Sequence, residues 1–264
     1  MGDLVDGSAF VTGAGSGIGR AIATALAAAG APVGLMDLNG AAASETAEAI
    51  TSAGGHAWST DGDTSSWADV DSAIGRTVSN LGALGIVVNA AGILDGYLPA
   101  DEQPIDLWER VIAINLTGVF HGCKRALAEL MPRGGGRIIN IASAAGLVGD
   151  GGGAAYVAAK HGVVGLTRRI ATTHGPLGIT CNAICPGPIQ TSLRSNSMDI
   201  LGASAPDMAN VGIGTSQEAI ARVVPLARRG TVDEVAACAA FLASSGASYV
   251  NGLMLTVDGG WSAR

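Results

Sequence analysis

The sequence predicts a single α/β domain in which helices cover both faces of a parallel sheet. Short apolar runs alternate with longer helical segments along all 264 residues. Strands that are apolar throughout are typical of a parallel sheet buried on both faces. No internal repeat and no linker rich in proline and serine divides the chain, so residues 1–264 are expected to form one domain. Together these patterns favour a doubly wound sheet of about seven strands.

Seven short apolar runs mark the expected strands, and six longer segments between them mark the expected helices. The strands are Ser8–Thr12, Val33–Asp37, His56–Thr60, Ile86–Asn89, Arg137–Ala142, Ile179–Ile184 and Leu253–Val257. The helices are Ile18–Ala29, Ala41–Ala53, Trp67–Leu81, Pro104–Met131, Ala154–His174 and Val232–Ser244. Strand and helix alternate from end to end, so right-handed crossovers should connect parallel neighbours.

One segment, Ser192–Ile220, breaks this alternation. It is rich in serine, methionine, glycine and asparagine and is too long for a plain connection. Long loops inside compact domains are uncommon and are often lids over binding sites. We therefore expect a mobile substrate lid at about residues 192–220, the alternative being an excursion without function.

Charge and hydropathy exclude several classes of function. The net charge is −7 and no block of basic residues occurs, which argues against nucleic-acid binding. The most apolar stretch, Ala21–Met36, is interrupted by glycine and proline and is too short to cross a membrane. Met1–Asp6 is acidic and carries no apolar run, so no secretory signal is expected. The sequence predicts a cytoplasmic protein without nucleic-acid or membrane partners.

The cysteines and histidines do not have the spacing of metal ligands. The cysteines are Cys123, Cys181, Cys185 and Cys238, and their spacing fits neither a zinc site nor a redox pair. Reduced thiols of this kind are typical of the cytosol. His56, His121 and His174 have no acidic or cysteine partner at ligand spacing. We therefore predict no metal site.

Tyr156 and Lys160 are the residues with the clearest chemical implication. Four positions apart on a helix, they project from the same face. A neighbouring ammonium favours the phenolate, so Lys160 should lower the pKa of Tyr156 below its usual value of about 10. Such a phenol can exchange a proton with an alcohol or carbonyl oxygen. The pair alone occurs too often by chance to decide a function.

A glycine-rich turn, Thr12–Arg20, follows the first expected strand and opens an alanine-rich helix. Its glycines, Gly13, Gly17 and Gly19, permit a tight turn and let a pyrophosphate approach the backbone at the positive helix end. Ser16 and Ile18 lie within the turn. The spacing differs from the commoner dinucleotide fingerprint, but the strand–turn–helix context is the same.

Asp37, at the end of the second expected strand, favours NAD over NADP. It lies about 20 residues after the glycine turn, where a carboxylate can accept hydrogen bonds from the adenosine ribose. A 2′-phosphate would meet a like charge there. Leu38 and the two residues after it are not basic.

Two further turns are weaker candidates for cofactor contacts. Asp63 and Thr64 follow the third expected strand and could contact the adenine. Asn89, Ala90 and Gly92 belong to a turn of small residues after the fourth strand, through which a ribose or flat ring could pass.

Taken together, these motifs resemble the short-chain dehydrogenase/reductase family from Thr12 to Gly260, which implies a Rossmann-like fold. The family's Asn-Asn-Ala-Gly stretch appears as residues 89–92 with its second Asn replaced by Ala90. Its catalytic Asn, Ser, Tyr and Lys match Asn115, Ser143, Tyr156 and Lys160. The stretch that cradles the nicotinamide in the family is matched by Pro186, Gly187, Ile189 and Thr191.

The resemblance implies a role for each matched residue. Ser143 would orient the substrate oxygen, and Tyr156 would take or give its proton. Lys160 would lower the pKa of Tyr156 and bind the nicotinamide ribose, and Asn115 would hold a water that links Lys160 to solvent. The hydride would pass directly between substrate and nicotinamide, without a metal.

The expected substrate is a small, uncharged secondary alcohol or its ketone. The expected pocket is mainly apolar and contains no Arg or Lys to clamp a carboxylate or phosphate. Its walls are Leu94, Tyr97, Ser143, Ala145, Leu147, Val148, Tyr156, Gly187, Leu193, Met198 and Leu201. A 3-oxoacyl thioester reductase of the same family is one alternative, and a non-catalytic NAD-sensing protein on the same fold is another.

The resemblance also implies a homo-oligomer, most often a tetramer in this family. The long helices Pro104–Met131 and Ala154–His174 and the last strand would form the contacts. Small residues on the second of these helices would permit close helix packing, although they would equally suit packing on the sheet.

Overall fold

The chain forms one seven-stranded parallel sheet in the order β3-β2-β1-β4-β5-β6-β7. A computed structural model describes residues 3–208, 211–212 and 216–263. The strands are β1 (Ser8–Thr12), β2 (Val33–Asp37), β3 (Ala57–Asp61), β4 (Leu84–Asn89), β5 (Gly136–Ile141), β6 (Ile179–Pro186) and β7 (Met254–Val257). Chain order reverses between β1 and β4, so the predicted doubly wound sheet is confirmed.

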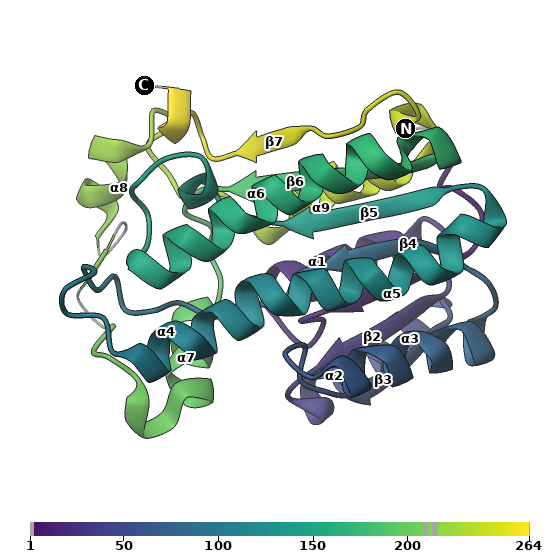
Figure 1. Ribbon diagram of the computed structural model, residues 1–264, viewed down its shortest axis with the longest axis horizontal. Helices are drawn as coiled ribbons and strands as arrows, with labels where there is room; N and C mark the ends of the chain where they lie inside the picture. The colour runs from purple at the N-terminus through teal and green to yellow at the C-terminus, as the bar shows by residue number, and fades with distance from the viewer. Residues whose placement is uncertain (1–2, 209–210, 213–215, 264) are drawn as a thin grey trace.

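Helices cover both faces of the sheet, which separates two apolar cores. Helices α1 (Gly17–Ala28), α2 (Gly40–Ser52) and α9 (Val232–Ala243) pack into the core on one face. Helices α3 (Trp67–Leu81), α5 (Gly118–Arg133) and α6 (Ala154–His174) pack into the other. Figure 1 shows α5 and α6 side by side in front of the sheet, with α1 and α9 behind it.

The high alanine content has a packing reason at the contact between α1 and α9. Ala23 and Ala27 on α1, and Ala236 and Ala239 on α9, are all buried in the same core. Small side chains let two helix backbones approach closely without leaving voids between them. Larger side chains such as Leu26 fill the space between these helices and the sheet, contributing about 1.5–3 kcal/mol each.

The predicted helix Pro104–Met131 is not regular. It begins as α4 (Ile105–Ile112), passes through a π-helical turn at Ala113–Thr117 and continues as α5. Such π turns are rare and frequently lie at functional sites. Apolar periodicity does not reveal one extra residue in a turn, so the sequence predicts an uninterrupted helix.

The predicted lid contains helices that its composition does not suggest. Helix α7 (Leu193–Leu201) and helix α8 (Gln217–Val223) lie within or at the end of this segment. Both are short and polar, which hides their periodicity. Figure 1 places them at the end of the sheet towards which the strand arrows point. Positions 209, 210 and 213–215 of the predicted lid lie outside the described residues.

The remaining structural expectations concern boundaries, thiols and membranes. The predicted strand and helix ends agree with the observed ones to within two residues; β6, for example, continues two residues further, to Pro186. None of the four cysteines forms a disulfide. Among the described helices, none has the length and apolar character that crossing a bilayer requires.

Candidate active site

A cleft of about 780 Å³ runs along the carboxyl ends of the strands. In open α/β sheets, ligands bind at this edge, where the strand order reverses. The cleft brings together most of the predicted site residues from turns far apart in the chain. These are Gly13, Ser16, Gly17, Ile18, Gly19, Asp37, Leu38, Asp63, Thr64, Ala90, Gly92, Ser143, Tyr156, Lys160, Pro186, Gly187, Ile189, Thr191 and Leu193.

The glycine turn has a backbone that other residues would not tolerate. Gly13 and Gly17 have φ angles of 66° and 51°, in the left-handed region that favours glycine. A Cβ on Gly19 would lie 2.1 Å from the carbonyl oxygen of Gly13. Helix α1 can therefore start close to β1, with its first turn facing the cleft.

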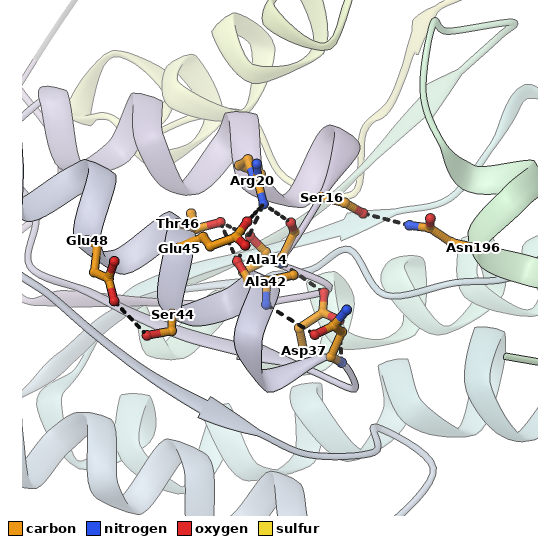
Figure 2. A network of polar contacts seen from close by, with 12 residues as sticks. Ala14, Ser16, Arg20, Asp37, Ala42, Ser44, Glu45, Thr46, Glu48 and Asn196 are labelled. Atoms are coloured by element: carbon orange, nitrogen blue, oxygen red, sulfur yellow. Dashed lines mark hydrogen bonds and ion pairs between the residues drawn. The ribbon is translucent and has the colours of Figure 1, made fainter. Parts of the chain in front are cut away.

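The first turn of α1 has the features of a phosphate site. Its N-cap, Ser16, makes no capping bond to the helix, whereas Asn39, Ser66 and Thr231 cap α2, α3 and α9. The Ser16 hydroxyl instead accepts a hydrogen bond from Asn196 of α7, at 2.9 Å (Figure 2). The first N–H groups of α1 thus have no side-chain cap, and a dinucleotide pyrophosphate fits them.

Asp37 is held rigidly at the rim of the cleft. Its two carboxylate oxygens accept hydrogen bonds from the backbone N–H groups of Gly15 (2.8 Å) and Asn39 (2.9 Å). A Cβ at position 15 would lie 2.9 Å from this carboxylate, so the fourth glycine of the turn is also required. Figure 2 shows Arg20 beside this site, where it forms an ion pair with Glu45 at 3.6 Å.

The side chains of two of the weaker cofactor candidates, Asn89 and Asp63, form hydrogen bonds with other residues of the protein. Asn89 does not line the cleft, because it is buried and donates a hydrogen bond to Asn140 at 2.8 Å across β4 and β5. Its contact with the cofactor stays a prediction. Asp63 lines the cleft, but its carboxylate is engaged by Arg110 at 2.9 Å and by Ser65.

Tyr156, Lys160 and Ser143 converge on one end of the cleft. Tyr156 and Lys160 lie on α6 and are 7 % and 4 % exposed, and Ser143 follows β5. The Lys160 ammonium donates a hydrogen bond to the carbonyl oxygen of Ile141 at 2.9 Å. It lies 5.6 Å from the centroid of the Tyr156 ring. The arrangement places a phenol, a hydroxyl and an ammonium against the same space.

Burial dominates the acidity of this pair in the protein alone. It raises the pKa of Tyr156 to about 12, against the effect of a hydrogen bond with the Ser143 side chain. It also lowers the pKa of Lys160 to about 8. The expectation that Lys160 brings the pKa of Tyr156 below 10 is therefore wrong for the protein without ligands. Both side chains are largely shielded from solvent, and the ammonium is directed to the carbonyl oxygen of Ile141.

Asn115 lies in the π-helical turn, fully buried and outside the cleft lining. Its amide oxygen accepts a hydrogen bond from the N–H of Ile93, and its amide nitrogen donates one to the carbonyl of the same residue, both at 2.8 Å. A Cβ on Gly92 would lie 3.0 Å from this amide and 3.6 Å from the Lys160 nitrogen. Asn115 thus anchors the loop beside Lys160, and its link to a water remains a prediction.

The apolar end of the cleft is lined by Leu94, Tyr97, Leu193, Ile200 and Trp261. Tyr97 adopts a φ angle of 61°, which is rare for an aromatic residue and is found where the surroundings determine it. Trp261 packs against Gly151, where a Cβ would lie 2.5 Å from the indole. Neither Ile200 nor Trp261 is identified by the sequence, because each reaches the site from a distant segment.

Five predicted pocket residues do not line this cleft. Ala145 is fully buried behind Tyr156, and Met198 is 40 % exposed on α7. A 3-10 turn after Ser143 places Leu147 and Val148 at a second hollow, beside the end of β7. Leu201 packs in the apolar clusters beneath α7. Fewer of the predicted residues therefore line the substrate end than the sequence suggests.

The expectation that no cation lines the pocket is wrong. Arg194, Arg228 and Arg229 all line the cleft. Arg194 lies 5.8 Å from the ring centroid of Tyr97 and donates a hydrogen bond to the carbonyl of Met208. Arg228 pairs with Glu234. Arg194 lies in the predicted lid, whereas Arg228 and Arg229 lie between α8 and α9, and only the fold brings them to the cleft.

Comparisons with known proteins show the family of this chain. A family model described as enoyl-(acyl carrier protein) reductase matches residues 13–262. The chain is 40% identical to 3beta-hydroxysteroid dehydrogenase 2 of Eggerthella lenta, over 98% of this chain and 96% of that protein. It is 39% identical to levodione reductase of Leifsonia aquatica, over 98% and 96% of the two chains. It is 37% identical to cyclohexanol dehydrogenase of Acinetobacter sp. (strain SE19), over 97% and 95%.

A solved structure of levodione reductase has the same fold. It superimposes with a TM-score of 0.88 at 37% sequence identity, covering 99% of both chains. The match extends over the glycine turn, the Tyr156–Lys160 helix and the segments around the cleft. The chain belongs to the short-chain dehydrogenase/reductase family of oxidoreductases.

Proposed function

We propose that this protein interconverts a small, mainly apolar secondary alcohol and its ketone, with NAD as cofactor. The observation that carries the proposal is the phenol of Tyr156, placed with Ser143 at the apolar end of a dinucleotide-sized cleft. Relatives named for cyclohexanol and levodione support a cyclic substrate. When bound, the nicotinamide supplies the acceptor or donor of the hydride.

Different residues around the cleft would bind different parts of the cofactor and the substrate. The glycine turn and the first turn of α1 would hold the pyrophosphate, and Asp37 the adenosine ribose. Pro186, Gly187, Ile189 and Thr191, at the end of β6, would support the nicotinamide. Leu94, Tyr97 and Trp261 would exclude water from the substrate ring.

Tyr156 would transfer the proton at the substrate oxygen. In reduction, its hydroxyl gives a proton to the carbonyl oxygen as the hydride arrives at the carbon. In oxidation, the phenolate takes the proton of the alcohol. Ser143 would orient this oxygen by a hydrogen bond. Lys160 would balance the negative charge of the phenolate and provide the route by which the proton leaves.

A substrate panel with both cofactors tests the proposal. Cyclohexanol, 3-hydroxybutyrate and the reduction of an acetoacetyl thioester would be compared by the absorbance of reduced nicotinamide. We expect the highest kcat/KM for the cyclic alcohol with NAD. Cofactor binding without turnover of any alcohol or ketone would instead support the non-catalytic NAD-sensing alternative.

Arg194 favours a second candidate, a hydroxy acid whose carboxylate would meet this guanidinium. Its present contacts with Tyr97 and the Met208 carbonyl favour the neutral substrate. Hydrogen bonds to charged groups contribute about 1.5–3 kcal/mol. Arg194→Met should therefore lower kcat/KM for 3-hydroxybutyrate by about 10–100-fold, and that for cyclohexanol far less. Equal losses of kcat/KM for both substrates would mean that Arg194 shapes the pocket but does not bind a substrate carboxylate.

We also propose a homotetramer that associates partly through α5 and α6. Phe120 on α5 is exposed, as is Trp67 beside it, and Lys124 lies over both rings at 5.9 Å and 5.1 Å. Phe120→Glu should therefore reduce the mass measured by light scattering. Leu177→Glu, which changes an exposed apolar residue at the far end of α6, is the matched control. A wild-type monomer would contradict the proposal.

A further inference from the structure

The start of α6 is held by a carboxylate from another part of the chain. Helix α6 begins at Ala154, and its N-cap, Gly153, has no side chain with which to cap it. The carboxylate of Asp95, in the loop after β4, takes this place. One oxygen accepts the N–H of Gly153 at 2.9 Å, and the other accepts the N–H of Tyr156 at 2.8 Å. Asp95 is fully buried.

This contact reproduces both halves of a capping box with one side chain. In an ordinary box, the N-cap side chain accepts the N–H of the third helical residue, whose own side chain accepts the N–H of the N-cap. Thr231 and Glu234 do this at α9. At α6 the third residue is Tyr156, so its side chain is left for the cleft while Asp95 satisfies its backbone. A carboxylate is also favoured electrostatically at a helix N-terminus.

The loop that carries Asp95 is itself fixed from three directions. Asn115 binds both backbone groups of Ile93 at 2.8 Å. The hydroxyl of Ser197, buried on α7, accepts the N–H of Leu94 at 2.9 Å. The N–H of Ala154 donates to the carbonyl of Leu98 at 3.0 Å. The loop therefore connects the π-helical turn and α7 to the first turn of α6.

Glycines before α6 make this approach possible. A Cβ on Gly153 would lie 2.7 Å from both carboxylate oxygens of Asp95 and 2.6 Å from the N–H nitrogen of Leu98. A Cβ on Gly152 would lie 2.4 Å from the ring of Tyr156. The sequence suggests only a turn here, whereas in the structure these two glycines let Asp95 and the Tyr156 ring lie against the backbone.

We propose that Asp95 is a positioning residue for the proposed reaction, which fixes the first turn of α6 and thereby the hydroxyl of Tyr156. The inference rests on the proposed function of Tyr156. Asp95 does not line the cleft, and its hydrogen bond to Tyr156 is to the backbone N–H and not to the phenol. A misplacement of about 1 Å at a reacting group can cost about 10²-fold in rate.

The charge of Asp95 gives the test a readout that lost stability would not change. The groups that face the phenol are the Ser143 hydroxyl, the Tyr97 phenol and the Asp95 carboxylate, with Lys160 one turn along α6. The negative charge of Asp95 opposes formation of the phenolate and so helps to raise the pKa of Tyr156. Removing the charge should lower that pKa. The rise of kcat/KM with pH in alcohol oxidation should then move to lower pH.

Asp95→Asn is the main variant, and Asn251→Ala is its matched control. Asn251 clamps the other end of α6, accepting the N–H of Cys181 at 2.9 Å and donating to the carbonyl of Ala171 at 3.0 Å. Asp95→Asn should lower the kcat plateau by about 10²-fold, leave the KM for NAD unchanged and move the pH limb downward. Asn251→Ala should lower the melting temperature but keep the wild-type kcat plateau and the wild-type pH dependence of kcat/KM.

Gly153→Ala provides a second variant, because its methyl group would displace the Asp95 carboxylate from the start of α6 without removing its charge. This variant should lower the kcat plateau and leave the pH dependence of kcat/KM unchanged. An Asp95→Asn enzyme with the wild-type plateau, or with a reduced plateau and an unmoved limb, would overturn the assignment.

Hydrogen exchange separates this inference from the proposed function. Equal turnover by wild type and Tyr156→Phe would overturn the proposed function, whether or not Asp95 holds the start of α6. Amide exchange over residues 153–160 should still be faster in Asp95→Asn than in Asn251→Ala. Equal exchange in these two variants would show that Asp95 does not hold the helix.

Discussion

Tyr156→Phe is expected to lower kcat by about 10²–10⁴-fold, the usual contribution of general acid–base catalysis. In the proposed function, the phenolic oxygen would exchange a proton with the substrate at the apolar end of the cleft. Phenylalanine keeps the ring that packs against Leu94, Ala145 and Met208, so the fold should be retained. The affinity for NAD, measured by fluorescence titration, should stay at the wild-type value.

The contrast with another tyrosine makes this experiment specific. The chain has three tyrosines, and Tyr249 is fully exposed, so Tyr249→Phe should leave turnover unchanged. Near-normal kcat in Tyr156→Phe would remove Tyr156 from the mechanism. A loss of NAD affinity together with kcat would point to a damaged cleft rather than a missing proton donor.

The high pKa of Tyr156 has a consequence for the direction of proton transfer. With the pKa raised to about 12 by burial, the phenol is protonated at neutral pH and is ready to act as the acid in ketone reduction. Alcohol oxidation requires the phenolate and is favoured at higher pH. The pKa of Lys160 is lowered to about 8, so this ammonium loses its charge as the pH rises through that value. The electrostatic stabilisation of the phenolate by Lys160 therefore weakens as the pH rises above about 8.

Local chemistry explains which parts of the site could be predicted from the sequence. The glycine turn is a contiguous segment, and its function depends on backbone freedom that only glycine supplies at Gly13 and Gly17. Tyr156 and Lys160 are fixed relative to each other by helical geometry alone. The sheet follows from apolar runs that need burial on both faces. Each of these features requires only short-range information.

The features that were missed depend on contacts across the fold. Asp95 in the sequence is one polar residue beside a glycine, and its role becomes visible only when Gly153 and Tyr156 lie against it. Arg194 enters the cleft because α7 folds back over the glycine turn. The raised pKa of Tyr156 could not be predicted for the same reason. Burial is its largest cause, and burial is a property of the whole fold.

Cofactor choice is the second property in which a large effect is expected. Asp37 lines the cleft, and its two oxygens are fixed by Gly15 and Asn39, so it cannot turn away from a 2′-phosphate without losing both bonds. Placing like charges together costs several kcal/mol, which corresponds to a preference for NAD of about 10²-fold or more in kcat/KM. Arg20, the cation beside this turn, pairs with Glu45 and does not line the cleft.

The double variant Asp37→Ser and Leu38→Arg should reverse this preference. Serine keeps an acceptor for the Gly15 N–H, and Leu38 is half exposed, so arginine can replace it without entering the core. The guanidinium would then meet the 2′-phosphate with charge-assisted hydrogen bonds. Leu38→Arg alone is the control, since it adds the cation but keeps the opposing carboxylate, and it should still prefer NAD. A wild-type enzyme with equal kcat/KM for NAD and NADP would contradict the role of Asp37, because the like charge would then have no measurable cost.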